Sequence, residues 1–423
     1  MRVLLLGSGG RESALAWALA QSSVVDDLVA APGNPGIAQL ASLADVDPSD
    51  PSAVVELARR LDAGLVVVGP EVPLVAGVGD ALRAEGVLVF GPDAGAAQIE
   101  GSKSHAKELM AAASVPTGRS ETFTGLSDEA GARAFMERLG PPFVVKVDGL
   151  AAGKGVVVTE EWAHAVTALQ ERLRTGSVLI EEYLDGEEAS LIAFTDGKTV
   201  VPCEPAQDYK RAFDADEGPN TGGMGSYSPV PACPDVMVEQ IVDEVIAPMV
   251  AATAAAGAPF TGALYAGLSL TADGPKVIEF NARFGDPETQ ALIPRLETDF
   301  GEVALATASG ELEGTKLQWS PRPCVTVVLA SGGYPGPHDT GHAIHGLDDA
   351  AALDGVFVFH AGTRLDGGTV VTGGGRVLNV GAVGDSFAAA RARAYEAASL
   401  IQFENVHFRK DIAARAVERT IQQ

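Results

Sequence analysis

The sequence predicts a multidomain protein of mixed α/β and α+β class. Its 423 residues suggest roughly two to four domains of about 100–200 residues each. Over residues 1–101, apolar strand patterns alternate with helical patterns, which is typical of a doubly wound parallel sheet. Beyond residue 101 the chain changes to hairpins with glycine-rich turns. We therefore expect an N-terminal α/β domain over residues 1–101, a central domain over 102–318 with a lid subdomain at about 116–192, and a small mixed α+β domain over 319–423.

The composition limits the partners and the compartment. A net charge of −26 argues against binding to nucleic acid or anionic membranes, so an anionic substrate must be held by locally concentrated cations and backbone N–H groups. Cys203, Cys233 and Cys324 are odd in number and far apart, which favours a reducing compartment. No apolar run reaches the ~18 residues of a membrane span, and Gly7–Glu12 interrupts the apolar start too early for a signal peptide. We expect a cytoplasmic protein.

The N-terminal segment places glycine turns where a parallel sheet binds ligands. The expected strands and helices, in chain order, are Val3–Leu6, Ser13–Gln21, Leu28–Ala31, Pro51–Leu61, Leu65–Val68, Ala76–Glu85 and Val87–Phe90. Three turns follow strands, at Gly7–Gly10, Asn34–Gly36 and Gly69–Glu71. Ligands of doubly wound sheets sit beyond the carboxyl ends of the strands, so we expect these turns to border a ligand site.

The Gly7–Gly10 turn does not match a dinucleotide fingerprint. Glu12 occupies the position of the third glycine, and no acid ends the second strand near Ala31 to hold a ribose. Two interpretations of the turn stay open. It offers N–H groups and a helix N-terminus to a phosphate, or it is a purely structural turn.

The central segment begins with lysines and a glycine loop. Gly101-Ser102-Lys103 opens a helix that runs to about Ala113, and the apolar strand Phe143–Val147 contains Lys146. A lysine in such a strand is costly unless its ammonium finds an anion. The loop Asp148–Gly155 then leads into the strand Val156–Thr159, and such a hairpin with a basic tip can close over phosphates. It is not a Walker A loop, which would open into a helix.

Two acidic motifs follow. The strand Val178–Leu184 ends in two carboxylates, and Gly186–Ser190 leads into another strand. Later, Glu279, Asn281 and Arg283 alternate after an apolar strand and would share one face. Two oxygen ligands beside a permanent cation suit a polyphosphate with bound Mg²⁺. Taken singly, each motif has an ordinary alternative, a solvated turn or a strand edge with a surface ion pair.

The order of these motifs resembles the ATP-grasp superfamily. The resemblance implies that Lys103 and Lys146 hold the nucleotide phosphates and that the loop with Gly153, Lys154 and Gly155 is a lid. It further implies an adenine site, a ribose site, a site for Mg²⁺ (or Mn²⁺), and a cation beside the transferring phosphoryl group. The adenine site would be formed by Glu181, Glu182, Tyr183 and Leu184, and the ribose would be bound by Glu187 or Glu188. The metal would be bound by Glu279 and Asn281, and the cation beside the phosphoryl group would be Arg283. One departure is Tyr265, which stands where many members have a further metal-binding acid.

Nearly the whole chain resembles one family within that superfamily, the phosphoribosylamine–glycine ligases (glycinamide ribonucleotide synthetases). The resemblance is carried by Gly7–Glu12, Gly69–Glu71, Lys146–Gly155, Gln207–Arg211, Asn220–Gly225 and, most specifically, Glu279–Gln290. It implies that ATP, glycine and 5-phosphoribosylamine give ADP, phosphate and glycinamide ribonucleotide through a glycyl phosphate, in de novo purine biosynthesis. We expect small-molecule substrates and a monomer.

The resemblance also suggests where the substrates bind. The ribose 5-phosphate would be held by the N-terminal turns together with Lys210 or Arg211, and the glycine and the reacting amine would face Asp208 and the following loop. The turn and loop residues concerned are Gly9, Gly10, Asn34, Gly36, Pro70, Glu71, Asn220, Thr221, Gly223 and Met224. Lys146 and Arg283 would act in catalysis. Asp286 is a candidate acceptor of the amine's proton, and substrate or water are the alternatives.

The last segment shows no catalytic constellation. The expected strands are Cys324–Ala330, Val356–Phe359 and a pair, Thr369–Thr372 with Arg376–Val380, before an amphipathic helix over Phe387–Ile401. Four histidines are irregularly spaced in this segment, which favours solvated side chains over a metal site; they are His338, His342, His345 and His360. We expect this domain to pack against the first and to complete the substrate cleft.

Three other functions fit the sequence less well. An ATP-grasp carboxylase acting on a purine precursor or biotin is the nearest, but the Asn220–Gly225 loop and the Pro287–Gln290 tail argue against it. Glu12 argues against an NAD-dependent oxidoreductase. A non-catalytic nucleotide-binding module would have lost a lysine or a metal ligand, and both pairs are intact.

Overall fold

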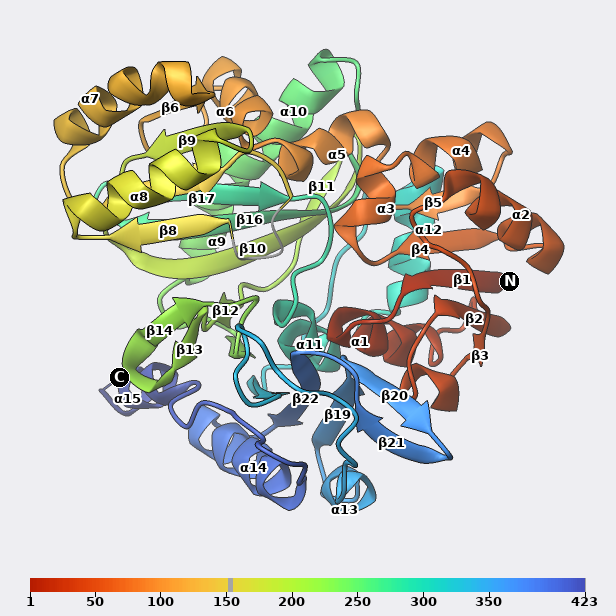
Figure 1. Cartoon of the computed structure of the whole chain (residues 1–423). Coiled ribbons are helices and arrows are strands. Elements are labelled where there is room, and N and C mark those ends of the chain that lie inside the picture. Colours follow the sequence, from red (N-terminus) through yellow and green to blue (C-terminus); the bar gives the residue numbers. More distant parts are fainter. Residues whose placement is uncertain (151–154, 423) are drawn as a thin grey trace.

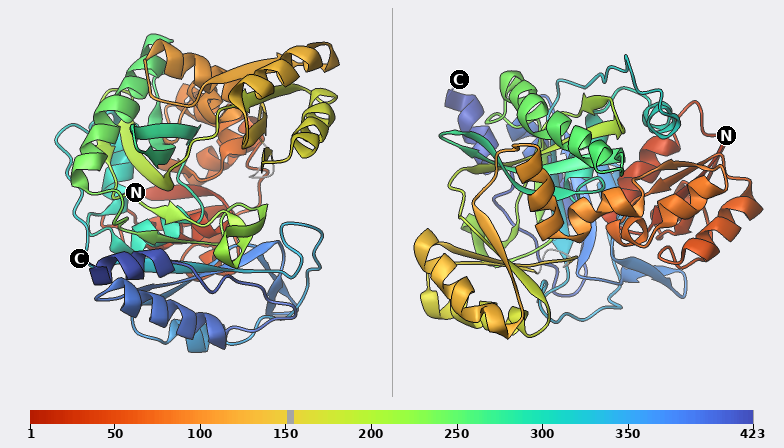
Figure 2. Two further views of the ribbon diagram at one scale, coloured as in Figure 1. Left: turned by 90° about the vertical axis from the view of Figure 1, so that its left-hand side faces the viewer. Right: turned by 90° about the horizontal axis from the view of Figure 1, so that it is seen from above.

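The computed structural model describes residues 1–150 and 155–422. Gly153 and Lys154, expected in the lid loop, lie outside the described residues. Figure 1 shows three regions that meet at the centre: the N-terminal sheet, the central sheets with their helices, and the C-terminal sheet. Figure 2 shows that the segment of residues 120–181, within the expected lid subdomain, projects from the body (gold to yellow). Among the described helices, none is long and apolar enough to cross a membrane.

The N-terminal region is a parallel sheet, as the alternating pattern predicts. Its strands run in the order β3-β2-β1-β4-β5, and all four pairs are parallel. The elements in chain order are β1 Arg2–Gly7, α1 Gly10–Leu19, β2 Asp27–Pro32, β3 Ser42–Leu43, α2 Pro51–Leu61, β4 Leu65–Val68, α3 Glu71–Val75, α4 Val78–Ala84 and β5 Leu88–Phe90.

Local sequence sets the helix limits in this sheet. Asp50 caps α2, since its carboxylate accepts hydrogen bonds from the N–H groups of Ser52 and Ala53. The helix expected over Ala76–Glu85 is present as α4, shorter by two residues at its start and one at its end, and the short helix α3 before it was not expected. Gly77 adopts a φ of +88° and separates α3 from α4.

The central region contains two antiparallel sheets. The lid sheet has the order β6-β9-β7-β8 and carries α7 and α8, and the second sheet has the order β11-β10-β16-β17. The lid has its own core, which includes Phe123, Met136 and Leu169. The elements are α5 Ala94–Gly101, α6 Lys103–Ala112, β6 Ser120–Thr124, α7 Glu129–Leu139, β7 Phe143–Val147, β8 Val156–Thr159, α8 Trp162–Leu173, β9 Ser177–Glu181, β10 Glu187–Asp196, β11 Val200–Pro202, α9 Asp235–Ile241, α10 Ala247–Ala255, β16 Thr261–Thr271 and β17 Gly274–Asn281.

The C-terminal sheet draws two of its strands from the middle of the chain. Its order is β12-β15-β18-β22-β19, so two strands of the segment Gln207–Ser228 belong to the sheet of the last domain rather than to the central sheets. The elements are β12 Gln207–Asp208, β13 Arg211–Phe213, β14 Glu217–Asn220, β15 Gly225–Ser228, α11 Glu288–Leu292, α12 Phe300–Ser309, β18 Cys324–Ala330, α13 Leu347–Ala351, β19 Val356–His360, β20 Thr363–Asp366, β21 Thr369–Thr372, β22 Arg376–Val383, α14 Phe387–Leu400 and α15 Ala414–Gln422.

The expected pairing of Thr369–Thr372 with Arg376–Val380 is wrong. Strand β21 pairs with β20, because β22 is already hydrogen-bonded to β18 on one side and to β19 on the other. Helix α11 packs against β15 and β18 and also contacts α1. It therefore ties the C-terminal sheet to the N-terminal domain directly behind the cavity described next.

Candidate active site

A cavity of about 740 Å³ lies where the regions meet. Its lining comes from the turns after β1 and β4, from α5 and α6, from the lid sheet, and from β17 and the loop after it. The segment Asp208–Gly222 and two side chains of the last domain, Tyr334 and Arg376, close the remaining side. Sequence-predicted residues as far apart in the chain as Gly9 and Asp286 are thus brought together.

Lysines and a buried carboxylate form one end of the cavity. Lys146, on β7, is only 3% exposed, and its ammonium lies 2.5 Å from Glu181 Oε2 and donates to the carbonyl of Ile278 at 3.0 Å. Lys103, at the start of α6, donates to the carbonyl of Gly149 at 2.8 Å. Burial lowers the pKa of Lys103, and neighbouring Glu279 opposes that shift. Both ammonium groups face the cavity.

The hinge residues after β9 line the same end. Glu182, Tyr183 and Leu184 all border the cavity, as does Gly155 of the lid hairpin. Glu182 is fixed by Arg119, whose backbone N–H and Nε both donate to Oε2 at 3.1 Å. Glu181 also lines the cavity, and its carboxylate pairs with both Lys146 and Lys107.

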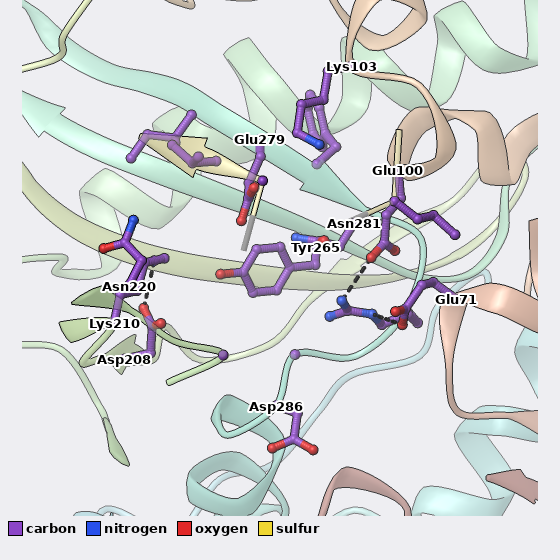
Figure 3. Close-up of a pocket in the computed structure, with 18 of the residues that line it drawn as sticks. Glu71, Glu100, Lys103, Asp208, Lys210, Asn220, Tyr265, Glu279, Asn281 and Asp286 are labelled. Carbon is purple, nitrogen blue, oxygen red and sulfur yellow. Dashed lines mark hydrogen bonds and ion pairs between the residues drawn. The ribbon is translucent and has the colours of Figure 1, made fainter. Parts of the chain in front are cut away.

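Glu279 and Asn281 lie at the carboxyl end of β17 and line the same cavity as Lys103 (Figure 3). Lys146 reaches β17 beside them, since its ammonium donates to the carbonyl of Ile278. A carboxylate and an amide oxygen are hard donors that suit Mg²⁺. The described residues contain no cluster of three or more His, Cys, Asp or Glu side chains that could hold a metal ion. A metal ion at this pair would therefore take its other ligands from phosphate oxygens and water.

Arg283 does not share the face of that pair, because β17 ends at Asn281. Its guanidinium turns instead to two carboxylates, Glu71 at 3.2 Å and Glu100 at 2.8 Å (Figure 3). Burial favours the neutral form of Arg283, but Glu100 and Glu71 outweigh burial and raise its pKa. The positive charge of Arg283 is therefore already matched within the protein.

A second charged group stands across the cavity. Lys210 Nζ lies 2.9 Å from Asp208 Oδ1 and 2.7 Å from Glu188 Oε2. Burial raises the pKa of Asp208, Lys210 opposes the rise, and the nearby carboxylates of Glu288 and Glu188 add to it. Glu187, the alternative ribose ligand, turns away to Gln207 and Arg419. Of the two candidates for the ribose, Glu188 is the one that lines the cavity.

A buried hydrogen-bonded group lies between these clusters. The Tyr265 hydroxyl contacts Ser190 Oγ at 2.8 Å and Glu288 Oε1 at 2.9 Å. Figure 3 shows that hydroxyl pointing toward the side on which Asp208 and Lys210 lie. Tyr265 therefore forms a hydrogen bond to the Glu288 carboxylate, at the position where many ATP-grasp members have a further metal-binding acid.

Asp286 occupies the N-terminus of α1. Its Oδ2 accepts from the backbone N–H of Arg11 at 3.2 Å, its Oδ1 accepts from Gln290 Nε2 at 2.9 Å, and Arg376 lies 3.4 Å from Oδ1. Burial alone would raise the pKa of Asp286, but Arg376 and Arg11 outweigh it and lower the pKa. A carboxylate with a lowered pKa is a weak proton acceptor.

The Gly7–Gly10 turn is held by acidic side chains. Gly9 N–H donates to Glu12 Oε2 at 2.6 Å, and Glu12 also pairs with Arg11 at 2.6 Å. Together with Asp286 at Arg11 N–H, these bonds occupy donors that a phosphate would need. They favour the structural interpretation of this turn, although Gly9 borders the cavity.

Other predicted substrate residues are further from the cavity lining. Asn34 is buried and holds its own turn, since its amide donates to the carbonyls of Ser8 and His360 and its oxygen accepts from Gly36 N–H. Arg211 donates to the carbonyl of Gly218. Among the described residues that line the cavity are Gly9, Pro70, Glu71, Asp208, Lys210, Asn220 and Thr221, but not Gly10, Asn34, Gly36, Arg211, Gly223 or Met224.

The sequence interpretation missed several lining residues. Lys107 lies one turn after Lys103 on α6 and pairs with Glu181, and Arg376 donates to the carbonyls of Gly222 and Asp286 at 2.6 and 2.8 Å. The spacing of Lys103 and Lys107 is a signal that could have identified Lys107, because residues four apart share a helix face. Arg376, in the last domain, gave no such signal.

The C-terminal histidines do not converge. His338 contacts the carbonyl of Gly336, and His342 lies 3.1 Å from Glu404. His360 is buried against Thr363 and Gly36, and burial lowers its pKa to about 4. The expectation of solvated side chains is therefore wrong for His360, which packs between the first and last domains.

Comparisons with known proteins cover the whole chain. Three family models match it: the N domain of phosphoribosylglycinamide synthetase over residues 1–100, its ATP-grasp (A) domain over 101–289 and its C domain over 324–415. A phosphoribosylamine–glycine ligase of Streptomyces coelicolor is 52% identical over 98% of this chain and 99% of its own. One of Brucella melitensis is 48% identical over 99% of both chains.

Solved structures agree. The crystal structure of phosphoribosylamine–glycine ligase from Thermotoga maritima has a TM-score of 0.82 and 31% sequence identity, covering 98% of this chain and 100% of that one. A biotin carboxylase domain from Hydrogenobacter thermophilus, 17% identical with a TM-score of 0.70 over 96% of this chain and 91% of that one, shares the fold. The chain belongs to the phosphoribosylamine–glycine ligase family of ATP-grasp enzymes.

Proposed function

We propose that this cavity joins glycine to 5-phosphoribosylamine at the expense of ATP, through a glycyl phosphate. The observation that carries the proposal is that Lys103 and Lys146 line one cavity together with Glu279 and Asn281. Cations facing a pair of hard oxygen donors suit a triphosphate with a bound divalent ion. The family assignment supplies the substrates.

The nucleotide would lie at the lysine end. We propose that the hinge after β9 receives the adenine, that Glu188 receives the ribose, and that Lys103 and Lys146 hold the phosphates. Glu279 and Asn281 would hold Mg²⁺, which offsets phosphate charge when bound. Their oxygen donors fit Mg²⁺ better than a softer metal. Glu181 keeps Lys146 in place, since its Oε2 lies 2.5 Å from that ammonium.

The reaction needs placement and exclusion of water more than covalent help from the protein. A carboxylate is a poor acyl donor, so the γ-phosphoryl group of ATP first transfers to a glycine carboxylate oxygen. The neutral amine then attacks the acyl carbon and phosphate leaves. Lys103 and Lys146 stabilise the charge on the phosphoryl oxygens. The lid would protect the acyl phosphate from hydrolysis.

For Arg283 and Asp286 we propose roles that differ from those suggested by the family resemblance. Arg283 pairs with Glu71 and Glu100, so we propose that it fixes the turn after β4 beside the phosphates. In this proposal its guanidinium does not bind the transferring phosphoryl group. Asp286 has a lowered pKa, so we propose that it binds Arg376 and the start of α1 rather than accepting a proton. Asp208, whose pKa is raised by burial, is the better candidate to accept the amine's proton.

The ribose phosphate would lie near the Gly222 loop and Arg376, with Lys210 on the Asp208 side. The N-terminal domain, the central domain and the C-terminal sheet of a single chain all line the cavity, which agrees with a monomer. The net charge and the widely spaced cysteines agree with the cytoplasm.

Glu279→Ala tests the metal assignment. We expect a folded protein with little or no ADP release when ATP, glycine and phosphoribosylamine, formed in situ from ribose 5-phosphate and ammonia, are supplied together. Glu121→Ala, at a half-exposed carboxylate on the outside of the lid, is the control and should keep full activity. Normal turnover of Glu279→Ala would contradict the assignment.

A further inference from the structure

Glu288 is a buried carboxylate that pairs with no cation in the part of the chain that the structure describes. It is 4% exposed and opens helix α11 in the cavity wall. Its Oε1 accepts hydrogen bonds from the Tyr265 hydroxyl at 2.9 Å and the Ser190 hydroxyl at 3.2 Å. Among the described residues, no hydrogen bond reaches Oε2 and no Lys, Arg or His lies within ion-pair distance of either oxygen. A buried carboxylate in this state is costly unless a ligand supplies the positive charge.

The other acids of the cavity differ from Glu288 in this respect. Each either has a cationic partner in the protein or belongs to the proposed metal pair. The partnered acids are Glu12 with Arg11, Glu71 and Glu100 with Arg283, Glu181 with Lys146, Glu182 with Arg119, Asp208 and Glu188 with Lys210, and Asp286 with Arg376. The metal pair contributes Glu279. Within the described cavity lining, Glu288 alone is left for a cation brought by a substrate.

We propose that Glu288 binds the α-ammonium group of the glycine substrate and selects amino acids over other small carboxylates. This inference rests on the proposed function and names a residue for one part of it. The choice between the two amines follows from their chemistry. The phosphoribosylamine nitrogen must be neutral to attack, and contact with a carboxylate whose charge no protein cation matches would favour its protonated form. Asp208 differs from Glu288 in this respect, because Lys210 already pairs with it. The α-ammonium of glycine stays protonated throughout and gains from such a contact.

The surroundings of Glu288 suit a fixed binding group. Tyr265 and Ser190 hold Oε1, which orients the carboxyl plane. A Cβ placed on Gly285 would lie 2.5 Å from Oε2 and 3.0 Å from Tyr265 Cε2. The absence of a side chain at Gly285 therefore leaves room for the carboxylate. Asp208, expected earlier to face the glycine, already has Lys210 at 2.9 Å and needs no second cation.

Glycolate is the probe that separates a charge-binding role from a structural one, since a hydroxyl replaces the ammonium in a molecule of nearly the same size. Acyl phosphate formed from glycine or glycolate is trapped with hydroxylamine and measured as hydroxamate. In the unaltered enzyme, kcat/KM should favour glycine strongly. In Glu288→Gln, kcat/KM for glycine should fall about 10- to 100-fold, while the value for glycolate changes little, so that the glycine-to-glycolate ratio collapses. An unchanged ratio would overturn the proposal.

Two further measurements keep the test decisive. Nucleotide affinity and the unfolding midpoint show whether Glu288→Gln is folded, and Glu121→Gln on the outer lid surface is the matched control. If Glu288→Gln does not fold, Tyr265→Phe decides. Tyr265→Phe keeps the Glu288 carboxylate but removes the hydrogen bond that the tyrosine donates to it. The KM for glycine should rise several-fold while the KM for ATP stays constant. An unaltered KM for glycine in that variant would refute the inference. If the unaltered enzyme forms no acyl phosphate from glycine, the proposed function itself fails.

Discussion

Lys107→Met would remove a buried ammonium that joins three parts of the nucleotide end of the cavity. Lys107 Nζ donates to Thr117 Oγ1 at 2.6 Å and to the carbonyl of Gly118 at 3.2 Å, and it pairs with Glu181. The side chains of Lys107 and Glu181 are 11% and 3% exposed. Methionine has a similar length and fills the same volume, so the change removes the charge without opening a cavity.

The expected size of the effect follows from this burial. Removing one partner of a buried ion pair costs about 3–5 kcal/mol. Glu181 retains Lys146 at 2.5 Å, so we expect the lower end, about 3 kcal/mol in the free energy of unfolding. Lys146 would then be the one described cation that pairs with Glu181. Its ammonium group would move less readily from Glu181 to a phosphate. The KM for ATP should rise about tenfold, as for the loss of one charge-assisted hydrogen bond.

Denaturant unfolding and the KM for ATP check both effects. Lys316→Met, at an exposed lysine, is the control and should change stability by less than about 0.5 kcal/mol. A Lys107→Met protein with the stability and the ATP KM of the unaltered enzyme would refute the view that Lys107 positions Glu181 and Lys146.

Two predictions concern protons. Burial alone would raise the pKa of Glu71, but Arg283 and Arg11 outweigh burial and lower the pKa. The ionised form of Glu71 therefore stabilises the folded protein above the unfolded pKa of about 4.3. This stabilisation is lost as the pH falls through the lower pKa of the folded state. Glu71→Gln should therefore show a flatter loss of stability in acid-unfolding curves, and an equally steep curve would contradict this. Asp286→Asn should keep the shape of the kcat–pH profile, because a carboxylate whose pKa Arg376 and Arg11 lower is a weak base; loss of a limb from that profile would restore Asp286 as the proton acceptor.

The sequence predicted elements best where local signals are strong. Helix Pro51–Leu61 was predicted to the residue, since Asp50 caps it and Pro51 suits its first turn. Strands Phe143–Val147 and Cys324–Ala330 were predicted equally well, because each is a short apolar run between turns. The helix expected over Ala76–Glu85 begins two residues late, at Val78, because Gly77 adopts a positive φ that depends on the backbone around it.

The sequence predicted which types of residue would line the site, but not which charged side chains would pair with one another. Alternation along one strand identified Glu279 and Asn281, but Arg283 lies past the end of that strand, where the period of two no longer applies. The partners of Arg283 are Glu71 and Glu100, about 200 residues away, and nothing local indicates them. The same holds for Glu288, whose missing cation is evident only once every other acid of the cavity has been matched.

The central claim is that Glu279 and Asn281 hold a divalent ion against the nucleotide phosphates. A crystal structure of the enzyme with Mg²⁺ and a non-hydrolysable ATP analogue tests it most directly. We predict one Mg²⁺ about 2.0–2.1 Å from a Glu279 carboxylate oxygen, the Asn281 amide oxygen and phosphate oxygens, with Lys103 and Lys146 on the same phosphates. A metal–nucleotide complex bound away from both side chains would contradict the account.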